Sequence, residues 1–275
     1  RNNVQFFHAG FHAAAMERLQ LETDLRYAVE RNELRLHYQP IIDVTTNRLV
    51  GAEALVRWQH PARGLLAPDT FIGLAEETGI IEQIGEWVLA AACGDSAQWV
   101  TAGAMEFISV NVSARQLESG DFPRTTLQTL GRLDFDPQHI ELEFTESAVM
   151  RDRVHGAEML RVLRAGGVRV AIDDFGTGYS SLAYLKQLPL NTLKIDRLFV
   201  RDITTSPYDA AIARAIIALA QSIDLRVIAE GVETQEQLDL LEALGCTMMQ
   251  GYYFSKPVPP DRVPAFFVAT PNRRA

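Results

Sequence analysis

The sequence has little cysteine, no excess of basic charge and no long hydrophobic run. Cys93 and Cys246 both lie among apolar residues, so we expect buried reduced thiols, as in a reducing cytoplasm, and no disulfide scaffold. Lysine and arginine total 26 against 35 acidic residues, a net charge of −9, which disfavours binding to a nucleic-acid polymer. No apolar run approaches the roughly 18 residues of a membrane helix, and no signal peptide is present. We therefore expect a cytoplasmic chain, with any membrane anchor of the parent protein in domains outside it.

What the 275 residues do contain is an alternation of strand-like and helix-like patterns, with 47% hydrophobic residues to fill a core. Strands are predicted at residues 34–43, 48–58, 106–112, 140–145, 168–173, 192–196, 225–230 and 246–251. Helices are predicted between most of them, at residues 71–78, 82–101, 122–133, 155–165, 181–188, 209–223 and 235–244. Such alternation predicts an α/β fold of the (β/α)8 TIM-barrel type. Because residues 44–47 are too short for a parallel crossover, the first strand is expected to be antiparallel, a modification of the ideal barrel.

The chain divides into four predicted segments. Residues 1–12 look like the remnant of an upstream domain, since the sequence lacks an initial methionine, and residues 13–33 carry a helix that leads into the barrel. The barrel domain is predicted at residues 34–268, followed by a frayed tail at 269–275.

Polar residues interrupt several of the apolar strands. They are Glu53, Asn111, Glu143, Asp173, Asp174, Lys194 and Glu230. Any one of them alone is typical of a satisfied core group or a salt bridge. Strand alternation turns Asn111, Glu143 and Lys194 toward the barrel axis, near the carboxyl ends of strands, where barrel active sites form. Because adjacent strand residues point to opposite faces, Asp173 and Asp174 require a turn, which we expect at residues 175–178.

Five carboxylates at one mouth would repel each other unless cations lie among them. Oxygen ligands favour Mg²⁺, Mn²⁺ or Ca²⁺ over zinc. Two such ions about 4 Å apart suit phosphodiester hydrolysis, because they neutralise the phosphate and generate hydroxide near neutral pH. Lys194 is expected to stabilise charge on phosphorus or to orient the water. Arg57, about 13 Å from Glu53 on the same strand face, is a candidate for a second phosphate, the alternative being a surface ion pair.

Eight short motifs follow one another in an order that resembles one bacterial family. They are YQPI at 38–41, EALVRW at 53–58, NVS at 111–113, ELEFTES at 141–147, DDFGTGYSSL at 173–182, LKID at 193–196, AEGVET at 229–234 and QGYYFSKP at 250–257. From about residue 17 to 263 the sequence resembles EAL domains, the phosphodiesterases of cyclic di-GMP. The retained metal and lysine positions resemble those of active members.

The resemblance implies a role for each matching residue. Two Mg²⁺ or Mn²⁺ ions would be held by Glu53, Asn111, Glu143 and Asp173, and by Asp173, Asp174 and Glu230, respectively. The implied catalytic residues are Lys194, Glu53 and Glu233. The implied substrate contacts are Gln39, Pro40, Leu55, Arg57, Gln250, Tyr253 and Pro257. Glu146 matches the residue that anchors the loop containing Gly176, Thr177, Gly178 and Ser180, which couples dimerisation to metal binding.

The activity implied by the resemblance is two-metal hydrolysis of cyclic di-GMP to linear pGpG. The implied partners are a second copy of the chain, packed through barrel helices near residues 173–182, and an upstream GGDEF or sensor domain, since RNNVQFF resembles the end of a GGDEF domain. Two alternatives stay open. One is a receptor that binds cyclic di-GMP without cutting it, and the other is an unrelated barrel acting on a different phosphate ester.

Other polar and aromatic residues are assigned simpler roles. The six histidines (His8, His12, His37, His60, His139 and His155) show no ligand spacing and are expected to be structural or exposed. Trp58, Trp87 and Trp99 are expected to pack in the core. Asp196 faces the axis and is expected to orient Lys194 or a metal-bound water without being a ligand.

Overall fold

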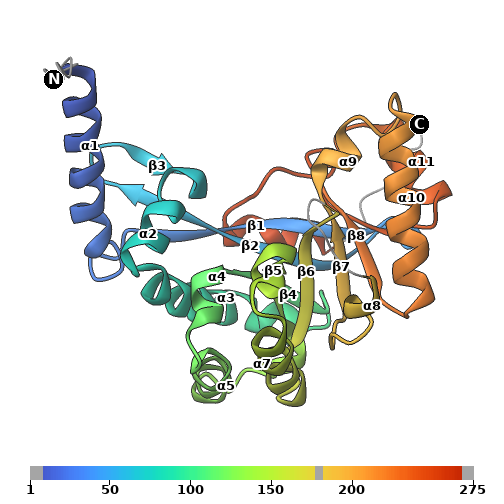
Figure 1. Cartoon of the computed structure of the whole chain (residues 1–275), viewed down its shortest axis with the longest axis horizontal. Coiled ribbons are helices and arrows are strands. Elements are labelled where there is room, and N and C mark those ends of the chain that lie inside the picture. Colours follow the sequence, from blue (N-terminus) through green and yellow to red (C-terminus); the bar gives the residue numbers. More distant parts are fainter. Residues whose placement is uncertain (1–8, 177–181, 268–275) are drawn as a thin grey trace, which may run out of the picture.

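Strands and helices alternate along the chain in the computed structural model, which describes residues 9–176 and 182–267 (Figure 1). The strands are β1 (Leu34–Asp43), β2 (Arg48–His60), β3 (Gly64–Leu66), β4 (Phe107–Val112), β5 (Ile140–Thr145), β6 (Arg169–Phe175), β7 (Thr192–Ile195), β8 (Arg226–Ala229) and β9 (Met248–Met249). The α-helices are α1 (Ala9–Arg26), α2 (Ile72–Thr78), α3 (Ile81–Thr101), α4 (Ala114–Glu118), α5 (Phe122–Arg132), α6 (Glu146–Arg151), α7 (Arg153–Ala165), α8 (Leu182–Leu185), α9 (Arg197–Arg201), α10 (Pro207–Ser222) and α11 (Gln235–Ala243). Short 3-10 helices are η1 (Pro68–Thr70), η2 (Pro137–His139) and η3 (Pro260–Phe266).

The strands close into a barrel. The hydrogen-bonded order is β1-β9-β8-β7-β6-β5-β4-β2, and β1 also pairs with β2, so the ring is complete, with β3 added to the outer end of β2. β1 is antiparallel to both of its neighbours, whereas β2 and β4 to β9 pair in parallel. The predicted modified TIM barrel with an antiparallel first strand is therefore confirmed.

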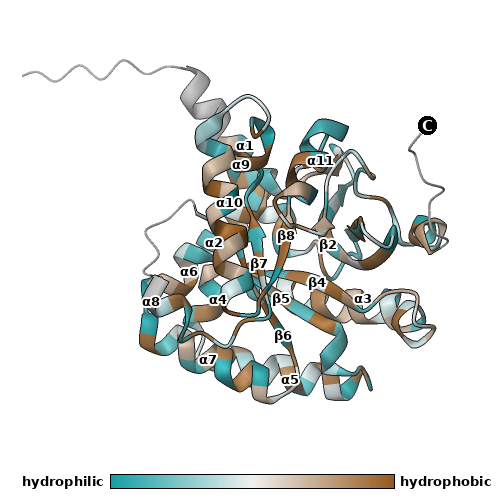
Figure 2. Ribbon diagram, turned by 90° about the vertical axis from the view of Figure 1, so that its right-hand side faces the viewer, coloured by the Kyte–Doolittle hydropathy of each residue, from teal (hydrophilic) through white to brown (hydrophobic). Residues whose placement is uncertain are grey.

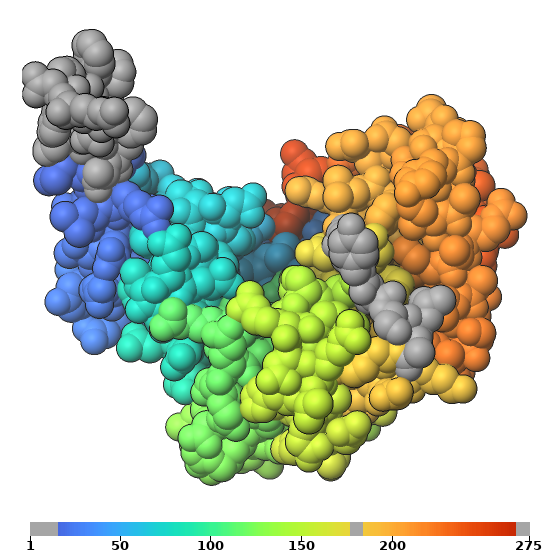
Figure 3. All heavy atoms as spheres, in the orientation of Figure 1, coloured from blue at the N-terminus to red at the C-terminus, as the bar shows by residue number. Residues whose placement is uncertain are grey.

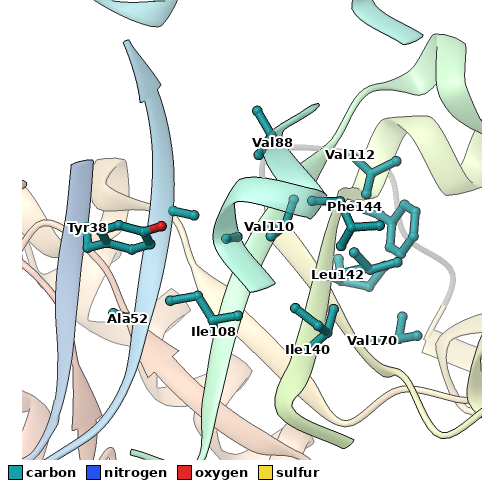
Figure 4. Packing of buried hydrophobic residues seen from close by; sticks show 14 of the residues in the cluster. Tyr38, Ala52, Val88, Ile108, Val110, Val112, Ile140, Leu142, Phe144 and Val170 are labelled. Carbon is teal, nitrogen blue, oxygen red and sulfur yellow. The ribbon is translucent and has the colours of Figure 1, made fainter. Parts of the chain in front are cut away.

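Strand alternation separates an outer apolar layer from the barrel interior. Val110, Leu142 and Phe144 are buried on the outer face of β4 and β5, where they pack with Val88 of α3 (Figure 4). Strands carry long apolar stretches, whereas the surrounding helices mix apolar and polar residues, as expected for helices with one solvated face (Figure 2). A second apolar cluster, formed by Ile41, Val50, Phe107 and Ile228, is separate from this layer. Packing on the outer layer leaves the inward positions near the strand ends available for polar chemistry.

The amino-terminal helix is part of the folded unit. It was expected within residues 13–33, but α1 begins at Ala9 and ends at Arg26, so the predicted boundary between residues 12 and 13 falls inside it. Leu21 and Leu25 are buried in the main core, and Glu17 forms an ion pair with Arg63 near β3. α1, α2 and the β2–β3 hairpin thus form a lobe beside the barrel. Residues 1–8 and the predicted tail from residue 268 onward lie outside the described residues.

Several short helices were not predicted from the sequence. α4, α6 and α9 each follow directly on a strand and have only five or six residues. Each begins after a side-chain cap, on Ser113, Thr145 and Asp196 respectively, which explains why such brief helices form. The last strand is also shorter than predicted, at Met248–Met249.

Two exclusions made from the sequence can be compared with the structure. Cys93 and Cys246 are buried and unpaired, and burial raises the pKa of each thiol to about 12, so both are inert at neutral pH. Within residues 9–176 and 182–267, every helix is too short or too polar to cross a bilayer.

Candidate active site

Acidic side chains from four strands converge on one lysine. Lys194 on β7 is fully buried, and its Nζ lies 2.7 Å from Glu143 and 2.5 Å from Glu230. The same ammonium lies 3.6 Å from Glu53 and 3.7 Å from Asp173. Residues far apart in the sequence therefore meet at the carboxyl ends of β5, β6 and β8 and midway along β2, as strand alternation predicted.

Amide side chains hold Glu53 in place. Asn111 Nδ2 donates a hydrogen bond of 2.6 Å to Glu53 Oε1, and Gln250 Nε2 donates one of 2.5 Å to Glu53 Oε2. Gln250 also donates to Gln39 Oε1 at 3.1 Å, and Gln39 stands directly opposite Glu53 in the β1–β2 pair. Hydrogen bonds to a carboxylate are stronger than neutral ones, so both oxygens of Glu53 have a fixed orientation.

The two adjacent aspartates both reach the mouth because β6 is irregular. The register with β7 shifts between Ile172 and Phe175, and Asp174 has a left-handed φ of 53°. The chain therefore bends at Asp174 and turns at Gly176, within the expected range of residues 175–178, of which 177 and 178 lie outside the described residues. Asp174 N–H donates to Asp173 Oδ1 at 2.9 Å, which fixes the two residues relative to each other.

Asp196 contacts Asp174 and caps a helix. Its Oδ1 accepts the Leu198 N–H at 2.7 Å at the start of α9. Burial, the charges of Asp173 and Asp196 and a hydrogen bond with Asp196 raise the pKa of Asp174 to about 6. The structure thus places Asp196 against Asp174, whereas we expected it to orient Lys194 or a water.

The cluster carries more negative charge than one lysine can neutralise. Burial, together with repulsion from neighbouring carboxylates, raises the pKa of Glu230 to about 8 and that of Glu143 well above its ordinary value. Burial works against ionised Glu53 as well, but the charge of Lys194 and the hydrogen bonds from Gln250 and Asn111 lower its pKa. Burial opposes the charge of Lys194 too, yet the surrounding carboxylates raise its pKa well above the usual value. Four carboxylates around one ammonium therefore take up protons or further cations.

The chemistry of these residues fits hard divalent cations. Glu143 Oε1 is buried without a hydrogen-bond partner among the described residues, whereas Glu230 Oε1 has the Lys194 ammonium as its partner. The available donors are carboxylate and amide oxygens, the ligands that Mg²⁺ and Mn²⁺ prefer. No three acidic, histidine or cysteine side chains in the described part of the chain have the arrangement of a ready-made metal site, and the Lys194 ammonium lies among the candidates.

The predicted substrate contacts are only partly brought together. Gln39 and Gln250 lie in the hydrogen-bond network of Glu53, and Leu55 and Arg57 follow Glu53 outward along the same face of β2. Pro40 stands opposite Ala52, so it lies on the other face of β1 from Gln39. The Tyr253 hydroxyl donates to Gln235 of α11 and its ring packs on Phe254, so this side chain is directed to α11.

The remaining predicted residues lie at the edge of the site. Glu146 is buried, and its Oε2 accepts the Gly176 N–H at 3.1 Å, which ties α6 to the end of β6. Glu233 is exposed, and within the described residues its carboxylate has no ion pair or hydrogen bond. Thr177, Gly178 and Ser180 lie outside the described residues. The proposed roles of Glu146 and Glu233 stay predictions.

His37 lies near the site, although we expected it to be structural or exposed. It stands opposite Leu55 in the β1–β2 pair, two residues from Gln39, and therefore on the same face as Glu53. The alternation of β1 counted back from Gln39 is the signal that would have placed it there. Figure 3 shows a hollow between the lobe of α1 and α2 and the helices α9 and α10, with the blue of the β1–β2 segment at its floor.

Comparison with known proteins gives consistent matches. The family model described as "EAL domain" matches residues 22–257. The chain is 46% identical over 264 residues to the bifunctional diguanylate cyclase/cyclic di-GMP phosphodiesterase MucR of Pseudomonas aeruginosa, covering 96% of this chain and 38% of that protein. It is 46% identical over 260 residues to the cyclic di-GMP phosphodiesterase NbdA of the same organism, covering 94% of this chain and 33% of that protein.

A solved structure matches as well. The phosphodiesterase of MucR in complex with cyclic di-GMP superposes with a TM-score of 0.85 at 46% identity, covering 89% of this chain and 99% of that one. The chain thus spans between a third and two fifths of the length of these curated relatives, but nearly all of the solved phosphodiesterase unit.

Proposed function

The chain belongs to the EAL domain family, and from this premise we propose that it hydrolyses cyclic di-GMP to linear pGpG with the help of two Mg²⁺ or Mn²⁺ ions. The observation that carries the proposal is the cluster of Glu53, Glu143, Asp173 and Glu230 around the buried Lys194. Two relatives that are 46% identical to this chain over the aligned 264 and 260 residues are named as cyclic di-GMP phosphodiesterases, which supports the same substrate here.

The proposed metal ligands divide into two overlapping groups. Glu53, Asn111, Glu143 and Asp173 would hold one ion, and Asp173, Asp174 and Glu230 the other. When bound, such ions neutralise phosphate charge and lower the pKa of a coordinated water. The unpartnered buried Oε1 of Glu143 supports this assignment, because a cation would satisfy it.

The chain's own residues orient the reacting groups. Hydrolysis joins a water oxygen to phosphorus and breaks one phosphorus–oxygen bond to a ribose, which opens the ring and leaves a terminal phosphate and a free hydroxyl. Lys194 supplies positive charge beside the developing negative charge, and the carboxylates that raise its pKa keep it protonated at neutral pH. Gln250 and Asn111 fix Glu53, so that it does not have to reorient during the reaction. Leu55 and Arg57 extend the site toward the second nucleotide.

We further propose that the chain acts as a homodimer and as part of a longer signalling protein. The dimer contact would lie on barrel helices near residues 173–182, and upstream GGDEF or sensor domains would regulate the site. MucR, which is named as both a cyclase and a phosphodiesterase and is much longer than this chain, supports the presence of such domains.

Turnover of cyclic di-GMP in Mg²⁺ or Mn²⁺ tests the proposed activity. We expect linear pGpG by chromatography. We expect Glu53→Gln to reduce turnover at least about a hundredfold, because Glu53 is a proposed metal ligand and the loss of a residue that merely orients a ligand already costs about 10–100-fold. Glu106→Gln is the matched control, since Glu106 pairs with Arg226 at the amino-terminal end of the barrel. A folded protein that binds cyclic di-GMP but forms no product in either ion would contradict the enzyme assignment and favour a receptor.

A further inference from the structure

The hairpin of β1 and β2 continues past the carboxylates with a row of polar and apolar side chains on one face. The antiparallel register pairs Gln39 with Glu53, His37 with Leu55 and Arg35 with Arg57. The opposite face carries Leu36, Tyr38 and Trp58, which are buried in the core. Glu53 and Gln39 are buried, whereas the row becomes partly exposed from His37 and Leu55 outward. The blue of the β1–β2 segment lies at the floor of the hollow in Figure 3.

His37 lies two residues from Gln39 in this row, where a nucleotide bound at Glu53 could contact it. Alternate residues on a strand are about 7 Å apart, so His37 is one step outward from Gln39 and one step inward from Arg35. Leu55, its partner across the hairpin, is a proposed substrate contact. A sugar and base attached to a phosphate at Glu53 would extend over this position.

The surroundings of His37 determine its protonation state and therefore its hydrogen-bonding roles. The backbone of Pro257 lies next to the ring, in a segment that runs beside β1 through the backbone pair of Tyr38 and Val258. Burial and the nearby Arg57 charge lower the pKa of His37, so the ring is neutral at pH 7. A neutral imidazole that donates from one nitrogen has its acceptor on the other.

We propose that His37 is a specificity-determining residue whose second ring nitrogen accepts a hydrogen bond from the N1–H or 2-amino group of guanine in the bound dinucleotide. This inference rests on the proposed function, because it needs a guanine dinucleotide in the hollow. Guanine carries the 2-amino donor that adenine lacks, so the contact favours cyclic di-GMP over cyclic di-AMP. Leaving a site's polar group unpaired is what penalises the wrong base.

The test compares His37→Phe with the wild type on three substrates. These are cyclic di-GMP, cyclic di-AMP and bis(p-nitrophenyl) phosphate, a diester without a base. His37→Phe keeps a flat ring but removes the acceptor, so we expect KM for cyclic di-GMP to rise about two- to tenfold with kcat within about twofold, the effect of one neutral hydrogen bond. KM for the other two substrates should stay the same. His139→Phe is the matched control, because the His139 ring also contacts a backbone carbonyl, that of Glu106 at 2.6 Å.

Three outcomes overturn the inference when the wild type cuts cyclic di-GMP. An equal loss on cyclic di-GMP and cyclic di-AMP means that His37 contacts sugar or phosphate, and an equal loss on all three means that the variant damages the site. No change on cyclic di-GMP shows that the base is read elsewhere. If the wild type binds cyclic di-GMP without cutting it, the proposed function fails, and the same comparison is made on Kd by calorimetry. If it neither binds nor cuts cyclic di-GMP, both proposals fall.

Discussion

At the scale of single residues, the site holds more buried carboxylates than positive charges. Lys194 gives one positive charge to Glu53, Glu143, Asp173 and Glu230, all within 3.7 Å of its Nζ. Burial removes the solvent that would otherwise screen their repulsion. The carboxylates with raised pKa values therefore bind protons when divalent cations are withheld and release them when cations bind.

The proton uptake predicts an unusual dependence of stability on pH. Glu230 has a folded pKa of about 8 against an ordinary value of 4.5, and burial is the main cause. Between these two pH values the folded state holds more protons than the unfolded state, so stability falls as pH rises. In chelator, we expect the free energy of unfolding from urea titrations to decrease by about 1–3 kcal/mol from pH 5 to pH 8.

Added Mg²⁺ or Mn²⁺ should increase the free energy of unfolding at pH 8, because the cation competes with fewer protons for the carboxylates there. The same addition should have less effect at pH 5. Greater stability in chelator at pH 8 than at pH 5 would contradict the pKa shift of the cluster.

Single residues also show where sequence reasoning succeeds. Strand alternation was enough to place Glu53, Asn111, Glu143 and Lys194 together, because side-chain direction in a regular strand depends only on parity. Parity did not show the left-handed φ angle of Asp174, which precedes the turn at Gly176. His37 was expected to be structural or exposed because it has no ligand spacing, although the parity of β1 places it on the face of Glu53.

At the scale of elements, the carboxyl end of β6 is fixed by contacts on both sides. Gly176 has a φ of 100°, its N–H donates to Glu146, and a Cβ at this position would lie 2.9 Å from the Phe199 ring. A residue with a side chain is therefore strained here both by backbone angle and by space.

Gly176→Ala should consequently destabilise the protein by about 1–3 kcal/mol and weaken Mn²⁺ binding, because the end of β6 carries Asp173 and Asp174. Urea denaturation and calorimetry measure the two effects. Gly94→Ala is the control, since Gly94 lies inside α3 with no atom within 4 Å of a Cβ, and it should stabilise by about 0.5–1 kcal/mol. Equal changes in the free energy of unfolding for the two substitutions would show that the chain does not require glycine at position 176, directly after β6.

Elements differ in how well their sequence defines them. The long strands and helices were predicted to within a few residues because many apolar positions share one period. The ends of α1 were missed because its burial depends on α2 and on β2–β3, which a local pattern does not report. The helices α4, α6 and α9 were missed because a helix of five or six residues depends on its cap rather than on periodicity.

At the scale of the whole molecule, one exposed apolar residue lies next to the predicted dimer region. Val154 at the start of α7 is 83% exposed. The neighbouring Arg153 packs its guanidinium over Tyr184, 5.4 Å from the ring centroid, in the segment that follows residues 177–181. A second copy of the chain would cover this apolar surface at the same time as it contacts the loop neighbours.

Sedimentation velocity should therefore give a dimer for the wild type, and Val154→Asp should shift it toward the monomer by at least about tenfold in Kd, because a charge would be buried in the contact. Leu65→Asp provides the comparison, since Leu65 is exposed on β3 in the other lobe. A monomeric wild type would contradict the proposed dimer. Equal weakening of the dimer by both variants would show that the contact does not lie at Val154.

The junction of β1 with β9 has two register pairs, against ten between β1 and β2. Residue 250 follows β9 directly, and its amide bonds Glu53, so ring closure and completion of the pocket occur in the same step. During synthesis, β1 leaves the ribosome long before its last neighbour exists. A nascent chain released before Met248 would keep β1 and β8 as open sheet edges, prone to pairing with other chains, and Glu53 would lack its glutamine partner.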